Sequence, residues 1–292
     1  MRDYIIMTDS CCDLTEQEVN ELSLTVLPLS YTIDGETHLN TPDHADMSPE
    51  DFFAKIAKGA MCTTAAANVG QFAEAMRAVL EEGKDILCIS FSSALSTTYQ
   101  SACIAADDLR EEFPEAKIIV IDSLSASRGQ GMLLYRTVQE RRRSGADIET
   151  LADYVRGIIQ SQCHWFIVDD LNHLKRGGRV SAAAALAGTV LGIKPVMHTD
   201  SEGRLIPMSK ARGTKGALRA LVDKVEELGI EPAKNQPLFI CHANCPDSVE
   251  YVKELLRERF GVTDVRAEFI GPVIGAHTGC GTLGLFFVGT KR

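Results

Sequence analysis

Short apolar runs alternate with amphipathic segments through the first half of the chain, and this alternation constrains the fold more than any other feature. Residues 4–7, 86–90 and 118–122 have the character of buried strands. The last two are each followed by hydroxyl residues and a helical pattern. Repeated strand–helix units form parallel sheets with helices on both faces. The sequence therefore predicts an α/β fold whose first part is a mainly parallel sheet flanked by helices.

Capping signals indicate where two of the helices begin. Thr15 and Glu18 have the spacing of a capping box, and Ser48 precedes a proline suited to the first helical turn. Residues 24–33 are apolar and β-branched, and they predict one strand with an irregular middle at Pro28.

The second half of the chain repeats the alternation with a new set of elements. A helix is expected over residues 214–228, and further strands are expected over residues 165–169, 204–207, 238–242, 265–270 and 285–288. We therefore predict two α/β lobes, residues 1–158 and residues 159–292, that together form one unit.

Charge and composition exclude several classes of protein. Lys plus Arg number 30 against 40 for Asp plus Glu, and a net charge of −10 does not suit a nucleic-acid-binding surface. The apolar run over residues 182–193 is too short and too rich in Ala and Gly to span a bilayer. Nine cysteines without framework spacing favour free thiols in a reducing compartment. We expect a cytoplasmic protein without stable membrane insertion.

Hydroxyl residues gather where the predicted strands end. They occur at residues 8–10, at residues 90–93 with Ser96, and at residues 122–123, while Thr63 and Thr64 stand just before a predicted helix. The carboxyl ends of strands in an open α/β sheet line the ligand crevice, and helix N-termini attract anions. The pattern predicts a neutral site for an anionic head group. The alternative is that these residues only cap helices and end strands.

Other candidate motifs are weaker. His277 lies in a glycine-rich turn over residues 275–279 and is either structural or part of a site. Residues 279–284 match a dinucleotide-binding GxGxxG pattern, but only eight residues follow, too few for the helix, strand and acid that the motif requires. We interpret these glycines as a turn that another backbone or a ligand approaches closely.

The sequence contains neither a complete metal-binding motif nor a catalytic signature. Cys241, His242 and Cys245 lack a second pair of ligands unless Cys280 joins them, so we predict no metal site and no cofactor. No nucleophile elbow, zinc-protease helix, phosphate loop or kinase signature occurs, and we assign no catalytic residue.

Several segments, taken together, resemble the DegV family, the fatty-acid-binding proteins that serve as acyl-carrier subunits of bacterial fatty acid kinase. They follow the family order and extend over essentially the whole chain. The matching segments are residues 8–10 with 13–14, 92–96 with 99–102, 122–123, 174–181, 194–195, and 271–275 leading to His277 and Gly279.

The resemblance implies a long-chain fatty acid held in a tunnel at the junction of the two lobes. Its carboxylate would meet Thr63 or Thr64, and Ser93 or Ser96, with His277 close by. A partner kinase would phosphorylate that carboxylate, so the chain would be a lipid-binding protein without activity of its own. Two arginines in the family's basic turns would dock the kinase, namely Arg179 and Arg212.

Three positions depart from the usual family pattern. Residues 65–68 read Ala-Ala-Ala-Asn where the family usually has Ser-Gln-Pro-Ser, which removes a hydroxyl beside the head group. Thr97 replaces a glycine and Cys280 replaces a proline, and both changes alter the freedom of the backbone near the pocket.

Two further expectations concern the ligand and the reaction class. The Ala-rich residues 181–192 offer a smooth wall for a slender acyl chain, or else they allow tight helix packing. The alternative function is a hydrolase or phosphoryl-transfer enzyme that uses the same Ser/Thr-rich crevice. It requires turnover by the isolated chain, whereas a carrier would retain lipid through purification.

Overall fold

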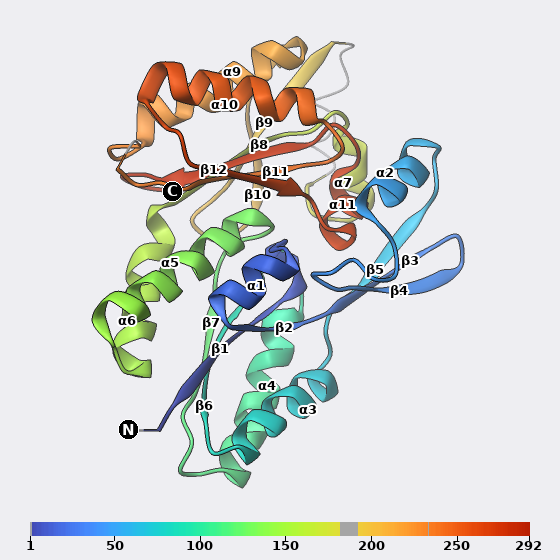
Figure 1. Cartoon of the computed structure of the whole chain (residues 1–292). Helices are drawn as coiled ribbons and strands as arrows, with labels where there is room; N and C mark the ends of the chain where they lie inside the picture. Colours follow the sequence, from blue (N-terminus) through green and yellow to red (C-terminus); the bar gives the residue numbers. More distant parts are fainter. Residues whose placement is uncertain (1, 182–191, 233) are drawn as a thin grey trace.

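The structure, a computed structural model, describes residues 2–181, 192–232 and 234–292 (Figure 1). None of the helices in this described part combines the length and the apolar character needed to cross a bilayer. The helices in it are α1 (Glu16–Leu22), α2 (Pro49–Ala57), α3 (Val69–Glu81), α4 (Thr98–Glu112), α5 (Arg128–Ser144), α6 (Ile148–Ile158), α7 (Leu171–Arg176), α9 (Gly213–Leu228), α10 (Pro246–Phe260) and α11 (Pro272–Thr278), with short 3-10 turns at Ser10–Cys12 and Ile159–Ser161.

Sheet A forms the centre of the first lobe and is parallel throughout, as predicted. Its strand order is β2-β1-β6-β7, built from β2 (Leu24–Leu27), β1 (Tyr4–Asp9), β6 (Asp85–Ser90) and β7 (Ile118–Asp122). Every residue of β6 is buried, as expected for a strand covered on both faces. Helices α3, α4 and α6 all contact β6. The expected helix starts are confirmed, because Thr15 and Glu18 form a reciprocal capping box and Ser48 caps α2.

The prediction of one strand over residues 24–33 is wrong. The chain forms two strands, β2 and β3 (Leu29–Ile33), which are separated at Pro28 and belong to different sheets. Proline has no N–H to donate to a strand ladder, so the pairing of β2 with β1 ends before it. Strand β3 then pairs antiparallel with β4 (Glu36–Asn40) and β5 (Cys62–Ala65) to form the small sheet B.

Sheet C forms the second lobe and is mixed. Its order is β10-β9-β8-β13-β11-β12, and only β11 and β12 run parallel to each other. Helices α9 and α10 lie on its outer side, at the top of Figure 1. The strands are β8 (Gln162–Ile167), β9 (Ile193–Thr199), β10 (Leu205–Arg212), β11 (Leu238–His242), β12 (Val265–Phe269) and β13 (Leu283–Val288).

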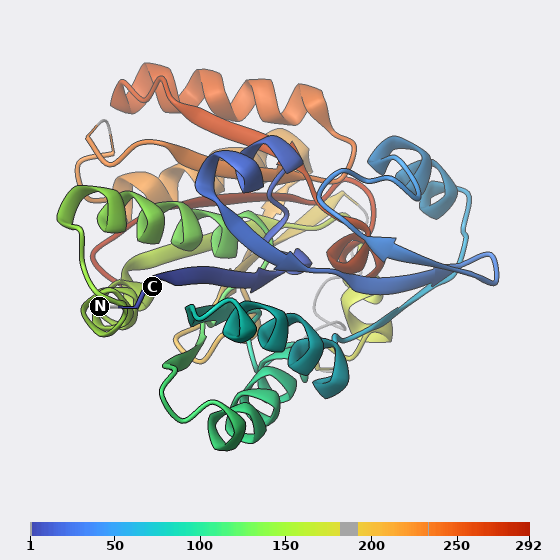
Figure 2. The same cartoon turned by 60° about the horizontal axis from the view of Figure 1, so that its bottom comes forward.

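Two helices join the lobes. Helix α5 packs beneath β8, β11 and β13 of sheet C, and α11 packs against α2, α7, β3 and β5 (Figures 1 and 2). One cluster of buried apolar side chains includes residues of sheet A together with Phe239 and Phe286 of sheet C. The junction therefore has a continuous core, and the division between residues 158 and 159 stays a prediction.

Candidate functional site

A cavity of about 470 Å³ lies at the junction of the lobes, and we call it the hydroxyl cavity. Its walls come from β5, from the loop between β6 and α4, from α11 and from the segment after α7. Among the predicted ligand and docking residues, it brings together Thr64, Ser93, Ser96, Arg179 and His277. These residues are far apart in sequence, so tertiary structure assembles the predicted site.

Thr64 and His277 form the central contact of this cavity. Thr64 Oγ1 lies 2.8 Å from His277 Nε2, within hydrogen-bond distance. Thr63, the neighbouring candidate, is exposed and does not line the cavity, because successive side chains of a strand point to opposite faces. Both threonines belong to strand β5, several residues before α3, rather than to a helix start.

The prediction that His277 lies in a glycine-rich turn is wrong, because residues 272–278 form α11. The glycine within this helix has a packing reason. A Cβ at Gly275 would lie 2.9 Å from ring atoms of both Phe52 and Phe53 of α2. A Cβ at Gly177 would similarly lie 2.1 Å from His277 Nδ1. The positions of helix α11 and of the His277 imidazole therefore depend on close contacts at Gly275 and Gly177 that only glycine permits.

The imidazole of His277 is neutral at pH 7. Burial and the nearby positive charge of Arg179 lower the pKa of His277 to about 4. A neutral imidazole carries one N–H, so its Nε2 either donates to Thr64 Oγ1 or accepts from it. The pair therefore offers an anionic ligand a polar contact without an additional full charge.

Ser93 and Ser96 belong to the loop that follows β6. The buried carboxyl group of Asp9 holds the start of this loop through hydrogen bonds. Asp9 Oδ2 accepts hydrogen bonds from the Phe91 N–H (2.7 Å) and from Ser90 Oγ (3.1 Å). We expected residues 8–10 to line the ligand crevice. Asp9 instead lies in the core and supports this loop through its hydrogen bonds. The Ser93 N–H donates to Asp122 Oδ1 at 3.2 Å, which ties the same loop to the end of β7.

Arg179 lies in the wall of the hydroxyl cavity and is half-buried, whereas the resemblance implied a docking role. Its Nε donates to the Leu95 carbonyl at 3.1 Å, and its Nη1 donates to the Gly177 carbonyl. Both acceptors are neutral, and Arg179 forms no ion pair with a carboxylate of the described residues. The head-group site is thus more positive than hydroxyls alone would make it. Arg212, the other docking candidate, is exposed at the end of β10 and does not line the cavity.

A small apolar pocket of about 50 Å³ continues the hydroxyl cavity into the junction. The two share Ala126, Leu205, Ile274 and Thr278 as lining residues, and the small pocket adds Phe166 and Phe286 of sheet C. The polar end and the apolar end therefore adjoin. Most of the Ala-rich segment expected to form a smooth wall, residues 182–191, lies outside the described residues.

The two glycines that begin the GxGxxG match do occupy a crowded turn with positive φ. A Cβ at Gly279 would lie 2.7 Å from His173, and one at Gly281 would lie 2.4 Å from Asp169. The nearest protein atoms in both cases belong to side chains and not to another backbone. Among the described residues no group of three or more His, Cys, Asp or Glu is placed to hold a metal ion. The thiols of Cys245 and Cys280 instead donate to the carbonyls of Thr282 and Phe53.

Sequence reasoning missed the lining residues that α11 contributes besides His277. Val273, Ile274 and Thr278 all line the hydroxyl cavity. The available signal was Gly271 followed by Pro272, since proline is favoured at the first position of a helix.

Comparisons with known proteins agree with this architecture. The family model described as "Uncharacterised protein, DegV family" matches residues 4–290. A DegV domain-containing protein of Clostridium perfringens is 38% identical over 292 residues, covering 100% of this chain and 99% of the relative.

Two solved structures share the whole fold. One, described as "Fatty Acid Binding of a DegV family Protein from Thermus thermophilus", has a TM-score of 0.86 and 30% identity, covering 99% of this chain and 100% of that one. The other is a fatty-acid-binding DegV family protein from Streptococcus agalactiae, with a TM-score of 0.85, 26% identity and 100% coverage of both chains. From the family match and the full-length relatives together, we conclude that this chain belongs to the DegV family.

Proposed function

We propose that this protein binds one long-chain fatty acid, with its carboxylate in the hydroxyl cavity and its acyl chain directed into the junction between the lobes. The observation that carries the proposal is the continuity of the hydroxyl cavity, where Thr64, Ser96 and His277 stand among apolar side chains, with a smaller pocket whose surface is mostly apolar. An amphiphile with one anionic end requires this sequence of surfaces. The fatty-acid-binding relatives from Thermus thermophilus and Streptococcus agalactiae support the same ligand class.

Apolar burial dominates the affinity in this proposal. Burying about 14 methylene groups at ~0.8 kcal/mol each contributes roughly 11 kcal/mol as an upper limit. The head group therefore needs orientation more than binding strength. Thr64 and the serines supply neutral hydroxyls, and Arg179 contributes a positive charge held by two backbone carbonyls.

We further propose that the bound carboxylate is presented to a partner kinase, which converts it to an acyl phosphate. In this scheme the chain is the non-catalytic, cytoplasmic subunit, and Arg212 at the exposed end of β10 docks the kinase together with Arg179. The pKa of His277 supports a carrier over a hydrolase, because burial and Arg179 lower it to about 4 and so make the imidazole a weak base for activating a hydroxyl such as that of Thr64.

Native mass spectrometry of freshly purified protein tests the ligand. We expect a stoichiometric adduct of fatty-acid mass, which organic extraction then releases for identification. Protein that is empty and also fails to take up palmitate or oleate would overturn the proposal. Hydrolysis of an ester or phosphoester by the isolated chain, lost in His277→Ala, would favour the enzyme instead.

A matched pair of variants tests the head-group assignment. Thr64→Val removes the hydroxyl that meets His277, and Thr63→Val makes the same change on the exposed face of β5. We expect the first to weaken fatty-acid binding roughly ten- to a hundredfold, since a hydrogen bond to a charged group is worth about 1.5–3 kcal/mol. The second should leave binding unchanged. Equal effects of the two variants would remove Thr64 from the site.

A further inference from the structure

The small apolar pocket, which continues the hydroxyl cavity into the junction, reaches the side chain of Phe286 on β13. Phe286 lines this pocket but not the hydroxyl cavity, so it lies away from the head-group site. Its side chain is buried and belongs to the core cluster that joins the two lobes. The surroundings of this ring therefore determine whether an acyl chain can continue past it.

The ring of Phe286 is held closely on two sides. A Cβ at Gly129 of α5 would lie 2.7 Å from the ring, and a Cβ at Gly284 of β13 would lie 3.0 Å from it. The backbone of α5 thus approaches the ring from one side, and the ring's own strand approaches it from the other. Because protein interiors are close-packed, the ring has little room to move aside without a shift of the backbone.

The surroundings of the ring on a further side are polar. The imidazole of His164 packs edge-on against Phe286, with 5.3 Å between the ring centroids. Burial lowers the pKa of His164 well below its ordinary value, and its Nδ1 has no hydrogen-bond partner among the described residues. Its Nε2 lies 3.5 Å from Ser125 Oγ, which accepts a hydrogen bond of 3.1 Å from Arg292 Nη2.

Arg292 adds a positive charge to this polar region. Its guanidinium donates to the carbonyls of Leu124 (2.7 Å) and Gln162 (3.2 Å), and it forms no ion pair within the described part of the chain. Burial lowers the pKa of Arg292 to about 10, which still leaves it charged at neutral pH. A hydrocarbon chain that entered this region would take polar groups out of water without pairing them, which is unfavourable.

We propose that Phe286 ends the acyl pocket and thereby limits the length of the fatty acid that this protein accepts, an inference that rests on the proposed function. Each methylene buried before the ring raises the affinity about fourfold. A methylene beyond it must displace a closely packed ring or lie against His164 and Arg292. The gain in affinity with chain length therefore stops at Phe286.

Competition of saturated fatty acids, from myristate to arachidate, against a fluorescent fatty acid tests this proposal. For the wild type we expect the affinity to rise with chain length and then to level off or fall. Phe286→Ala should raise the ratio of arachidate to palmitate affinity at least about tenfold, since room for two further methylenes is worth about sixteenfold. Phe286→Leu should shift the ratio less in the same direction, and it serves as the second probe if the alanine variant unfolds.

Phe287→Leu is the matched control, because Phe287 is buried in the other core cluster, with Leu221 and Val225 of α9. A variant that is only less stable weakens the binding of all the acids by the same factor, so its ratio stays unchanged. An unchanged ratio in the Phe286 variants, or an equal shift in Phe287→Leu, would overturn this inference and leave fatty-acid binding intact. A wild-type protein that binds none of the acids would overturn the proposed function itself, and this inference with it.

Discussion

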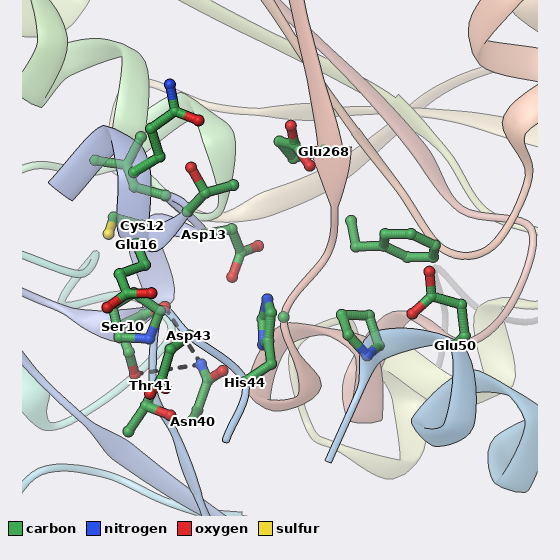
Figure 3. Close-up of a pocket in the computed structure, with 17 residues that line it drawn as sticks. Ser10, Cys12, Asp13, Glu16, Asn40, Thr41, Asp43, His44, Glu50 and Glu268 are labelled. Carbon is green, nitrogen blue, oxygen red and sulfur yellow. Dashed lines mark hydrogen bonds between the residues drawn. The ribbon is translucent and has the colours of Figure 1, made fainter. Parts of the chain in front are cut away.

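Two cavities adjoin the short helix α11, yet their walls have opposite chemistry. One is the hydroxyl cavity, and the other is a cavity of about 440 Å³ at the N-terminal end of α11, which we call the acidic cavity (Figure 3). The first presents Thr64, a neutral His277 and the uncancelled charge of Arg179, and it suits an anion. The second is lined by five acids, Asp13 and Glu268 among them, and among the described residues by neither lysine nor arginine. One helix can therefore border two cavities of different polarity, because its N-terminal end and its later turns meet different elements.

Burial acts on both cavities in the same direction, against charge. It lowers the pKa of His277 to about 4 and raises the pKa of Asp13 to about 7. The polarity of a cavity therefore depends on which charges remain uncompensated rather than on how many titratable groups line it. Four predictions test this contrast.

The largest expected effect concerns the buried ion pair between Arg128 and Glu18, near the acidic cavity. Arg128 is fully buried, binds Glu18 and lies 4.8 Å from the ring centroid of Phe239. Arg128→Met leaves Glu18 buried without its main partner and should lower the free energy of unfolding by about 3–5 kcal/mol. Urea denaturation measures this loss. Arg143→Met, which breaks an exposed pair with Glu140, should cost less than about 1 kcal/mol. Similar losses in the two variants would contradict the distinction.

The second prediction concerns pH, and the two cavities should respond with opposite sign. His277 has a folded pKa below its ordinary value of 6.5, so its contribution to stability is lost as the pH falls from 6.5 through 4. Asp13 has a folded pKa above its ordinary value of 3.8, so its contribution is lost as the pH rises from 3.8 through 7. Each contribution is on the order of 3–4 kcal/mol at most.

Two variants separate these pH effects in urea denaturation between pH 4 and pH 8. His277→Gln should flatten the loss of stability on the acid side, and Asp13→Asn should flatten the loss toward neutral pH. A pH profile of either variant parallel to that of the wild type would show that the group does not titrate as described.

The third prediction uses two glycines, each of which permits a close contact at one cavity. A Cβ at Gly177 would lie 2.1 Å from His277 Nδ1, and a Cβ at Gly271 would lie 2.5 Å from Asp13 Oδ1. Gly177→Ala should therefore weaken fatty-acid binding at a cost of about 1–3 kcal/mol, whereas Gly271→Ala should leave fatty-acid binding unchanged. Titration with palmitate tests this, with Gly157→Ala on α6 as the control, since nothing lies within 4 Å of its Cβ. An equal loss of affinity in the Gly177 and Gly271 variants would mean that the two cavities are not independent.

The smallest effects should distinguish the two serines. Ser96 Oγ accepts the Thr98 N–H at 3.2 Å, so Ser96→Ala should lower the free energy of unfolding by about 1 kcal/mol through the lost cap. Ser93 is exposed, and Ser93→Ala should change stability by less than about 0.5 kcal/mol. Affinity for palmitate then decides which serine contacts the carboxylate. Unchanged affinity in both variants would remove the serines from the head-group site.

The sequence alone predicted the elements that depend on local patterns. The strand at Leu238–His242, the capping box at Thr15 and Glu18, and the cap at Ser48 are confirmed, because each rests on contacts between residues a few positions apart. The family motifs likewise indicated Thr64 and His277 as members of one site. Those motifs indicate which residues form the site but not how these residues are arranged in space.

Tertiary structure alone decided what depends on distant contacts. The hydrogen-bond contact between Thr64 and His277 joins residues 213 positions apart, and α11 forms where glycines had suggested a turn. The acidic cavity had no sequence signal, because Asp13 and Glu268 belong to different lobes. Local sequence specifies which backbone conformations are favourable, whereas the burial and pairing that shift a pKa, or leave an oxygen unpaired, exist only after the lobes have packed together.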